Sequence, residues 1–118
     1  EVEPVLSPED VVEFQELTRS IHVSDSLLSY IVQLTSYSRE HPDVKVGVSP
    51  RGSLALRRAA QALALLRGEN YVNPDQIQLL APHVLAHRLI LHTEAELSGV
   101  TPKLVVEEVV EKTPVPTE

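Results

Sequence analysis

Apolar positions recur at spacings of three and four along most of the chain, the period of an amphipathic helix. Residues 25–40 show it most clearly, with one stripe made of Leu27, Tyr30, Ile31, Leu34 and Tyr37. Residues 50–67 carry leucine and alanine on both sides of the helical wheel, which is typical of a helix enclosed by others. We therefore expect an all-α fold, a small bundle of four to six helices, with no sheet larger than a two-stranded ribbon.

Capping residues and prolines set the boundaries of these helices. A serine or asparagine directly precedes a proline at residues 7–8, 49–50 and 73–74, the order that opens a helix. A proline inside a helix removes one hydrogen bond and clashes with the preceding turn, so Pro82 is expected to break or kink the helix that starts at Pro74, and residues 82–91 are taken as a separate helix. The expected helices of the bundle, taken as residues 1–100, lie near residues 8–20, 25–40, 50–67, 74–81 and 82–91.

The remaining segments are less regular. Residues 41–49 and 92–99 are expected to be loops, because glycine, proline and polar residues interrupt any period there. Residues 101–112 combine four valines, which favour a strand, with i, i+4 valine pairs, which favour a helix. We take a helix there, followed by a disordered tail over residues 113–118.

The helical wheel of residues 50–67 predicts which of its side chains face the core. They form one arc: Ala55, Leu56, Ala59, Ala62, Leu63 and Leu66.

Composition narrows the class of protein. The 118 residues are 42% hydrophobic and 23% charged, the balance of a globular domain, and they include no cysteine and no methionine. No apolar run approaches the ~20 residues of a membrane span, so we expect no span and a cytoplasmic location. The net charge of −7 argues against nucleic acid as the partner. Because even position 1 lacks methionine, we interpret the chain as a fragment.

Few residues suggest catalytic chemistry. His83 and His87 have the i, i+4 spacing of zinc ligands on a helix, but the metalloprotease motif needs a glutamate where Val84 stands. We therefore predict no metal site and no catalytic residue within this chain. The four glycines form no phosphate-binding P-loop.

Arg51 is the exception. It lies in the first turn of the expected helix 50–67, behind Ser49 as N-cap and Pro50 at the first helical position. A cation is disfavoured at this positive end of the helix dipole. Arg51 is therefore either a surface arginine that follows a proline, or part of a site for a phosphate supplied from elsewhere.

Four segments in order extend this picture: VSDSLLSYIV, REHPDVKVGVSPRGSLAL, ALLRGENYVNPDQI and VLAHRLIL. Together they resemble the C-terminal lid subdomain of MoxR-type AAA+ ATPases, over about residues 5–100. His87 and Arg88 match the HR of that family, without an implied catalytic role. Residues 103–112 depart from its pattern.

The resemblance implies a function for a longer protein. ATP and Mg²⁺ would bind between this lid and an N-terminal AAA+ core of the same chain, which carries the Walker motifs, sensor 1 and the arginine finger. Arg51 would be sensor 2, which reads the nucleotide phosphates, with Ser49 and Pro50 fixing its helix start. The whole protein would hydrolyse ATP in a homo-oligomeric ring, taken as a hexamer, and remodel or mature partner complexes like a chaperone, alongside von Willebrand factor A domain proteins. The fragment alone would be inactive and hold no cofactor.

Two other functions remain open from the residues. A stand-alone helical interaction module would bind a partner regardless of nucleotide and would not need Arg51. A helix-turn-helix or histone-like nucleic-acid binder would show a salt-sensitive affinity, which the acidic balance argues against.

Overall fold

The computed structural model describes residues 7–116, which form six α-helices, one 3₁₀ turn and two short strands. The helices are α1 (Pro8–Arg19), α2 (Asp25–Glu40), α3 (Pro50–Leu66), α4 (Pro74–Leu85), α5 (Thr93–Leu97) and α6 (Pro102–Lys112). The strands are β1 (Val44–Val46) and β2 (Ile90–Leu91), and the 3₁₀ turn η1 spans Ala86–Arg88. The all-α bundle with a sheet no larger than a two-stranded ribbon is thus confirmed for the described residues.

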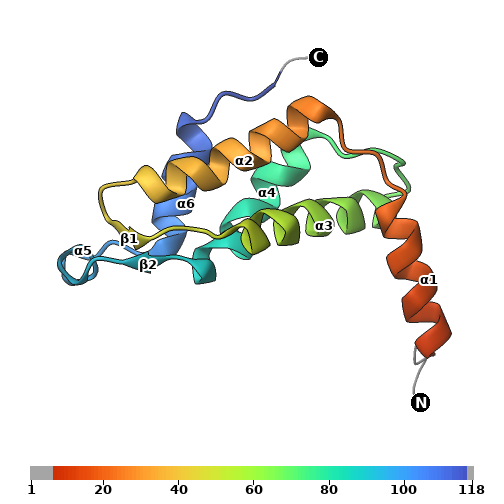
Figure 1. The fold of residues 1–118 in the computed structure, drawn as a ribbon, viewed down its shortest axis with the longest axis horizontal. Coiled ribbons are helices and arrows are strands. Elements are labelled where there is room, and N and C mark those ends of the chain that lie inside the picture. The colour runs from red at the N-terminus through yellow and green to blue at the C-terminus, as the bar shows by residue number, and fades with distance from the viewer. Residues whose placement is uncertain (1–6, 117–118) are drawn as a thin grey trace.

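The core lies between α2, α3, α4 and α6 (Figure 1). Helix α3 packs against α1, α2 and α4, and α6 covers α2 and α4. The largest fully buried apolar side chains come from these helices and the loop before α3: Tyr30, Leu34, Val48, Leu56, Ile77, Leu85, Val105 and Val106. Because α3 has neighbours on three sides, its beginning is held by the rest of the bundle.

Helix α1 projects away from this body (Figure 1). Thr18, in its last turn, is its buried residue, while the apolar side chains Val11, Val12, Phe14 and Leu17 are exposed. A capping box at Ser7 and Asp10 stabilises its start, so the helix is defined by local bonds more than by packing.

Three long-range contacts connect segments next to the ends of the helices. Strand β1 pairs antiparallel with β2, with Val44 opposite Leu91 and Val46 opposite Ile90. His22, after α1, forms a parallel bridge with Tyr71, before α4. The His41 Nε2 atom, directly after α2, lies 2.7 Å from the Glu108 Oε1 atom on α6.

The expected break at Pro82 is wrong. Helix α4 continues through Pro82 to Leu85, so neither a helix ending at residue 81 nor a separate helix over 82–91 exists. Ile77, Ala81 and Leu85 are all buried along one face of α4. Packing of this face against α3 and α6 outweighs the ~3 kcal/mol that an internal proline costs.

The chain after α4 is also not a helix. It passes through η1 and then extends as β2, with Leu89 and Leu91 buried. Residues expected to be loops are partly regular, because β1 lies within 41–49 and α5 within 92–99. Residues Pro102–Lys112 form a helix and not a strand. Of the tail expected to be disordered, Thr113 is buried and its hydroxyl donates to the Val109 carbonyl, while residues 117–118 lie outside the described part.

The inward face of α3 differs from the expected arc. The buried residues are Gly52, Leu56, Ala60, Gln61 and Ala64, whereas Leu66 is 73% exposed. Ala59 and Ala62 are only half-buried. Gln61 can lie inside because its amide donates to the Ile21 carbonyl at 2.8 Å, which satisfies the buried polar group. Tyr37 likewise lies at the edge of the α2 stripe, 38% exposed, and Thr35 and Ser38 are buried in its neighbourhood.

Candidate functional site

The start of α3 lacks the side-chain cap that the other long helices have. Ser49 occupies the N-cap position with extended backbone, and Pro50 follows, but the Ser49 hydroxyl forms no capping hydrogen bond. In the other described helices of eleven residues or more, a side chain accepts from the first turn: Ser7, Ser24, Asn73 and Thr101. The first turn of α3 also contains no acidic residue. Its positive end is therefore not neutralised by its own sequence.

Arg51 adds a further positive charge to this helix end. Its side chain is exposed, and within residues 7–116 it forms no hydrogen bond or ion pair. A guanidinium beside backbone N–H groups is suited to bind a phosphate, because it offers several donors in a fixed plane. The structure thus places Ser49, Pro50 and Arg51 together at one exposed helix start.

Gly52 and Arg88, which the sequence analysis did not assign to the site, also lie at the start of α3. Gly52 is buried, and a Cβ atom on it would overlap the Val48 side chain and lie 3.2 Å from the Arg88 Cδ atom. Arg88 is held in turn by its Nε–H group, which donates to the Val84 carbonyl at 3.2 Å. The glycine directly after SPR was the one signal in the sequence that another segment approaches this turn.

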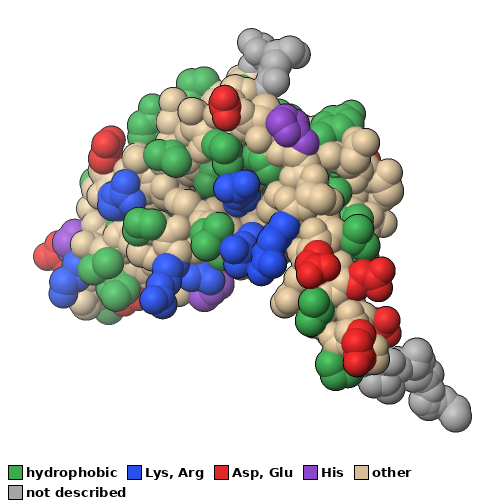
Figure 2. Space-filling view, turned by 45° about the vertical axis from the view of Figure 1, so that its right-hand side comes forward, with side chains coloured by type: hydrophobic (Ala, Val, Ile, Leu, Met, Phe, Trp, Pro, Cys, Tyr) green, Lys and Arg blue, Asp and Glu red, His purple; other side chains and the backbone are tan. Residues whose placement is uncertain are grey.

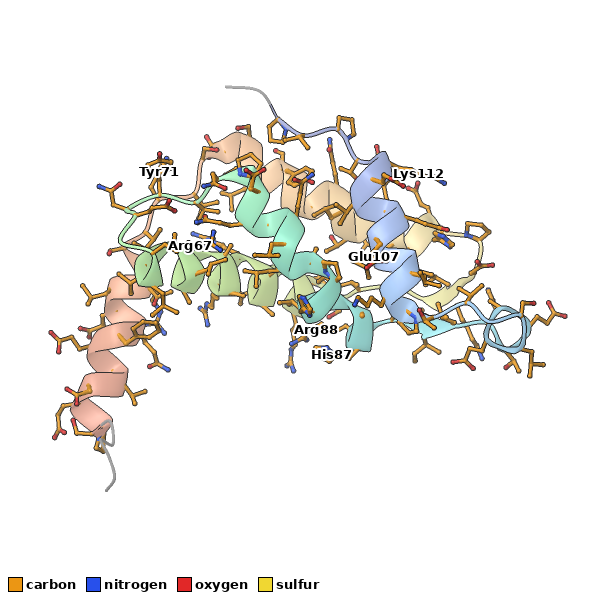
Figure 3. All side chains as sticks on the ribbon, turned by 180° about the vertical axis from the view of Figure 1, so that it is seen from behind. Arg67, Tyr71, His87, Arg88, Glu107 and Lys112 are labelled. Atoms are coloured by element: carbon orange, nitrogen blue, oxygen red, sulfur yellow. The ribbon has the colours of Figure 1, made fainter. Side chains whose placement is uncertain are left out.

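His83 and His87 do not lie on one helix. His83 lies on α4 and His87 in η1, so the end of α4 at Leu85 removes the single-helix spacing that zinc would require. Figure 3 shows His87 and Arg88 together at that turn. No group of three or more potential metal ligands occurs among the described residues.

No helix within residues 7–116 is long and apolar enough to cross a membrane.

Charge is unevenly divided over the surface. Figure 2 shows acidic side chains on the projecting α1 and a gathering of Lys and Arg on the adjoining face of the body. Helix α1 carries Glu9, Asp10, Glu13 and Glu16, and α3 carries Arg51, Arg57 and Arg58. A local basic face on a chain of net charge −7 suits a compact anion better than a long polyanion.

A spacious surface hollow lies elsewhere. It runs between α4, α6 and the segment after α6, where Gln78, Leu104 and Val115 line it together with Glu107, Glu108 and Glu111. Three carboxylates would repel a phosphate. The start of α3 remains the better candidate site.

Comparison with known proteins identifies the family. Residues 36–109 match the AAA lid domain family, a span that runs from the last turns of α2 into α6 and includes the candidate site. The match covers more than half of the chain.

Relatives along the whole chain agree with this match. The chain is 44% identical over 117 residues to the uncharacterized protein YeaC of Bacillus subtilis, covering 99% of this chain and 37% of that protein. It is 34% identical over 121 residues to the chaperone MoxR1 of Mycobacterium tuberculosis, covering 95% of this chain and 32% of the relative. A crystal structure from Cytophaga hutchinsonii, provisionally described as an ATPase, superposes with a TM-score of 0.87 at 30% identity, over 92% of this chain and 36% of that one.

This chain therefore spans about a third of the length of each of these relatives. Its sequence and its helical architecture agree with the same assignment: the chain belongs to the AAA lid domain family and is a lid of the MoxR type.

Proposed function

We propose that this chain is the lid of a MoxR-type AAA+ ATPase and that Arg51 is its sensor 2 residue, which contacts the phosphates of ATP bound to the core. The start of α3 supports this, because an exposed arginine lies at a helix end that has no side-chain cap and, within the described residues, no acidic partner. The guanidinium of Arg51 and the positive end of the α3 dipole repel each other, and an anion bound between them would reduce this repulsion.

In this proposal the chain contacts only the phosphate groups of ATP. Arg51 would hold phosphate oxygens, and Ser49 and Pro50 would fix the direction of the helix start. Mg²⁺ would neutralise phosphate charge when bound, but no cluster of ligands for it occurs in residues 7–116. The metal and the phosphate cradle therefore belong to the core in this proposal.

The lid would couple hydrolysis to movement. An arginine that contacts the terminal phosphate binds the ATP state more tightly than the ADP state, and a difference of this kind shifts the orientation of two domains. We propose a homo-oligomeric ring, taken as a hexamer, that remodels or matures partner complexes, with von Willebrand factor A domain proteins among the partners. The chaperone name of the mycobacterial relative supports this class of function.

The test is ATP hydrolysis by the full-length protein with Arg51→Ala. A charge-assisted contact of about 1.5–3 kcal/mol, made mainly in the transition state, predicts a turnover slower by roughly 10- to 100-fold. Arg51→Lys should restore part of the rate, because an ammonium keeps the charge without the planar fork.

Arg67→Ala is the matched control, since Arg67 is exposed at the opposite end of α3 (Figure 3). It should leave turnover unchanged. If Arg51→Ala also hydrolyses ATP at the normal rate, the sensor 2 role is wrong. Partner binding that is indifferent to nucleotide would then favour an interaction module.

A further inference from the structure

Arg39, in the last turn of α2, contacts the loop that leads into Arg51. Its Nη1 group donates to the Val48 carbonyl at 2.9 Å, and its Nη2 group donates to the Ser36 hydroxyl at 3.2 Å. One donor group thus reaches nine residues along the chain, and the other fixes the guanidinium on its own helix. Both terminal nitrogens of Arg39 therefore donate within the protein, which holds its guanidinium against the loop ahead of α3.

Val48 is held from its other side by the same helix. Its N–H donates to the Ser38 hydroxyl at 3.3 Å, and that hydroxyl donates to the Thr35 carbonyl at 2.6 Å. The Val48 side chain is 0% exposed. Both backbone polar groups of Val48 and its side chain are therefore fixed, and α2 supplies the partners of the two polar groups.

Two glycines bring these groups into direct contact. A Cβ atom on Gly47 would overlap the Arg39 side chain and lie 2.7 Å from its Cα atom. A Cβ atom on Gly52 would overlap Val48. Arg39 is thus packed against the loop at Gly47, and Val48 against the first turn of α3 at Gly52. A displacement of Val48 would move the turn that carries Arg51.

A third contact crosses the same interface. The Ser53 hydroxyl, one turn into α3, donates to the Thr35 hydroxyl at 3.1 Å. This bond ties α3 to α2 but does not restrain the loop ahead of Arg51. Arg39 and Ser38 remain the side chains that restrain Val48 by hydrogen bonds.

We propose that Arg39 is a positioning residue for Arg51: through Val48 it sets where the first turn of α3 presents the guanidinium. This inference rests on the proposed sensor 2 function. Misplacing a catalytic group by about 1 Å can reduce a rate by up to about 100-fold, so a loosened loop should be visible in turnover.

The experiment measures kcat and KM for ATP hydrolysis by the full-length protein with Arg39→Ala, Arg51→Ala and both changes together. Arg39→Ala should lower kcat by about 5- to 20-fold. Arg39→Lys should restore most of this loss, because an ammonium can still donate to the Val48 carbonyl. Arg67→Ala is the control arginine and should behave like the unchanged protein.

The double variant separates positioning from general destabilisation. If Arg39 acts through Arg51, Arg39→Ala should lower kcat by less than about 2-fold once Arg51 is already alanine. An equal loss in both backgrounds would overturn the proposal, because Arg39 would then act by another route. Full activity of Arg39→Ala beside a slow Arg51→Ala would overturn it while leaving the sensor 2 function intact.

Full activity of Arg51→Ala would instead overturn the sensor 2 function, and this inference with it. Thermal melting of each variant identifies a protein that no longer folds. If Arg39→Ala is such a protein, Arg39→Lys carries the same comparison, and a Lys variant without activity that still melts like the unchanged protein would contradict the proposed rescue.

Discussion

Ser49 is a serine at a helix N-cap whose hydroxyl does not cap the helix. An aspartate at that position would accept a hydrogen bond from the first turn and would oppose the positive end of the dipole. Ser49→Asp should therefore raise the free energy of unfolding by about 0.5–1 kcal/mol, as measured by urea denaturation.

The same change should impair the proposed function. A carboxylate beside Arg51 would neutralise the guanidinium and repel phosphate, so ATP hydrolysis by the full-length protein should fall. Thr101→Asp is the matched control, because Thr101 already caps α6 far from this site in the chain. A Ser49→Asp protein that is more stable and equally active would contradict a phosphate site at the start of α3.

Tyr30 gives a prediction about pH. Burial raises the pKa of its hydroxyl above the usual 10.0, an effect partly offset by the side chain of Gln78. As the pH rises, the unfolded chain loses this proton first, since its Tyr30 pKa is lower. The stabilising contribution is therefore complete below about pH 10 and is lost as the pH rises through the folded pKa.

Tyr30→Phe should reduce this alkaline loss of stability. At pH 7 it should change the free energy of unfolding by less than about 1 kcal/mol, because the buried hydroxyl has no hydrogen-bond partner of good geometry in the described residues. Tyr37→Phe is the control, since Tyr37 is 38% exposed. Urea denaturation at pH 7 and pH 10.5 compares the variants, and an unchanged pH dependence for Tyr30→Phe would show that another group causes it.

At the scale of elements, helix existence was more predictable than helix boundaries or faces. Caps at Ser7 and Asn73 start helices where the sequence predicts them, because capping is a local interaction. Pro82 was misjudged because the benefit of burying the α4 face comes from α3 and α6, which no local rule contains. The same limit applies to β1 and β2, whose pairing joins residues more than forty positions apart.

In the candidate site, too, features set by local sequence could be predicted and features set by distant contacts could not. Arg51 could be singled out, because a cation in a first turn violates a local rule. Arg39 could not, because its proposed role depends on a carbonyl nine residues away and on space left by Gly47. The wheel of α3 was wrong at Ala59 and Leu66 because the buried arc is set by where α1, α2 and α4 lie around α3, which the sequence of α3 alone does not contain.

The corrected face of α3 gives a prediction for packing. Ala60 is 1% exposed, so Ala60→Leu should overpack the bundle and lower the free energy of unfolding by about 1–3 kcal/mol. Ala59→Leu, at the half-buried neighbouring position, should cost less. Urea denaturation of both proteins measures the difference. A larger loss for Ala59→Leu would show that the original arc, and not the one described above, faces the core.

At the scale of the whole molecule, Figure 2 shows an acidic projecting helix beside a basic face of the body. Of the groups that could hold ATP, the described residues supply only Arg51 and the start of α3 in the proposed function. One charge-assisted hydrogen bond contributes about 1.5–3 kcal/mol. A dissociation constant of 1 μM requires about 8.2 kcal/mol, so Arg51 and one helix end are far from sufficient. The lid alone should therefore bind ATP weakly.

Calorimetric titration of the 118-residue chain with ATP and Mg²⁺ should accordingly give no binding in the micromolar range. The full-length protein is the positive control, because its core would supply the phosphate cradle and the metal ligands that this chain lacks among its described residues. Adding the Arg51→Ala change should weaken ATP binding or turnover only in the full-length protein. Micromolar binding by the 118 residues alone, with or without Arg51, would mean that the nucleotide has a site other than the start of α3, and the assignment of this chain as a lid that only completes a site would be wrong.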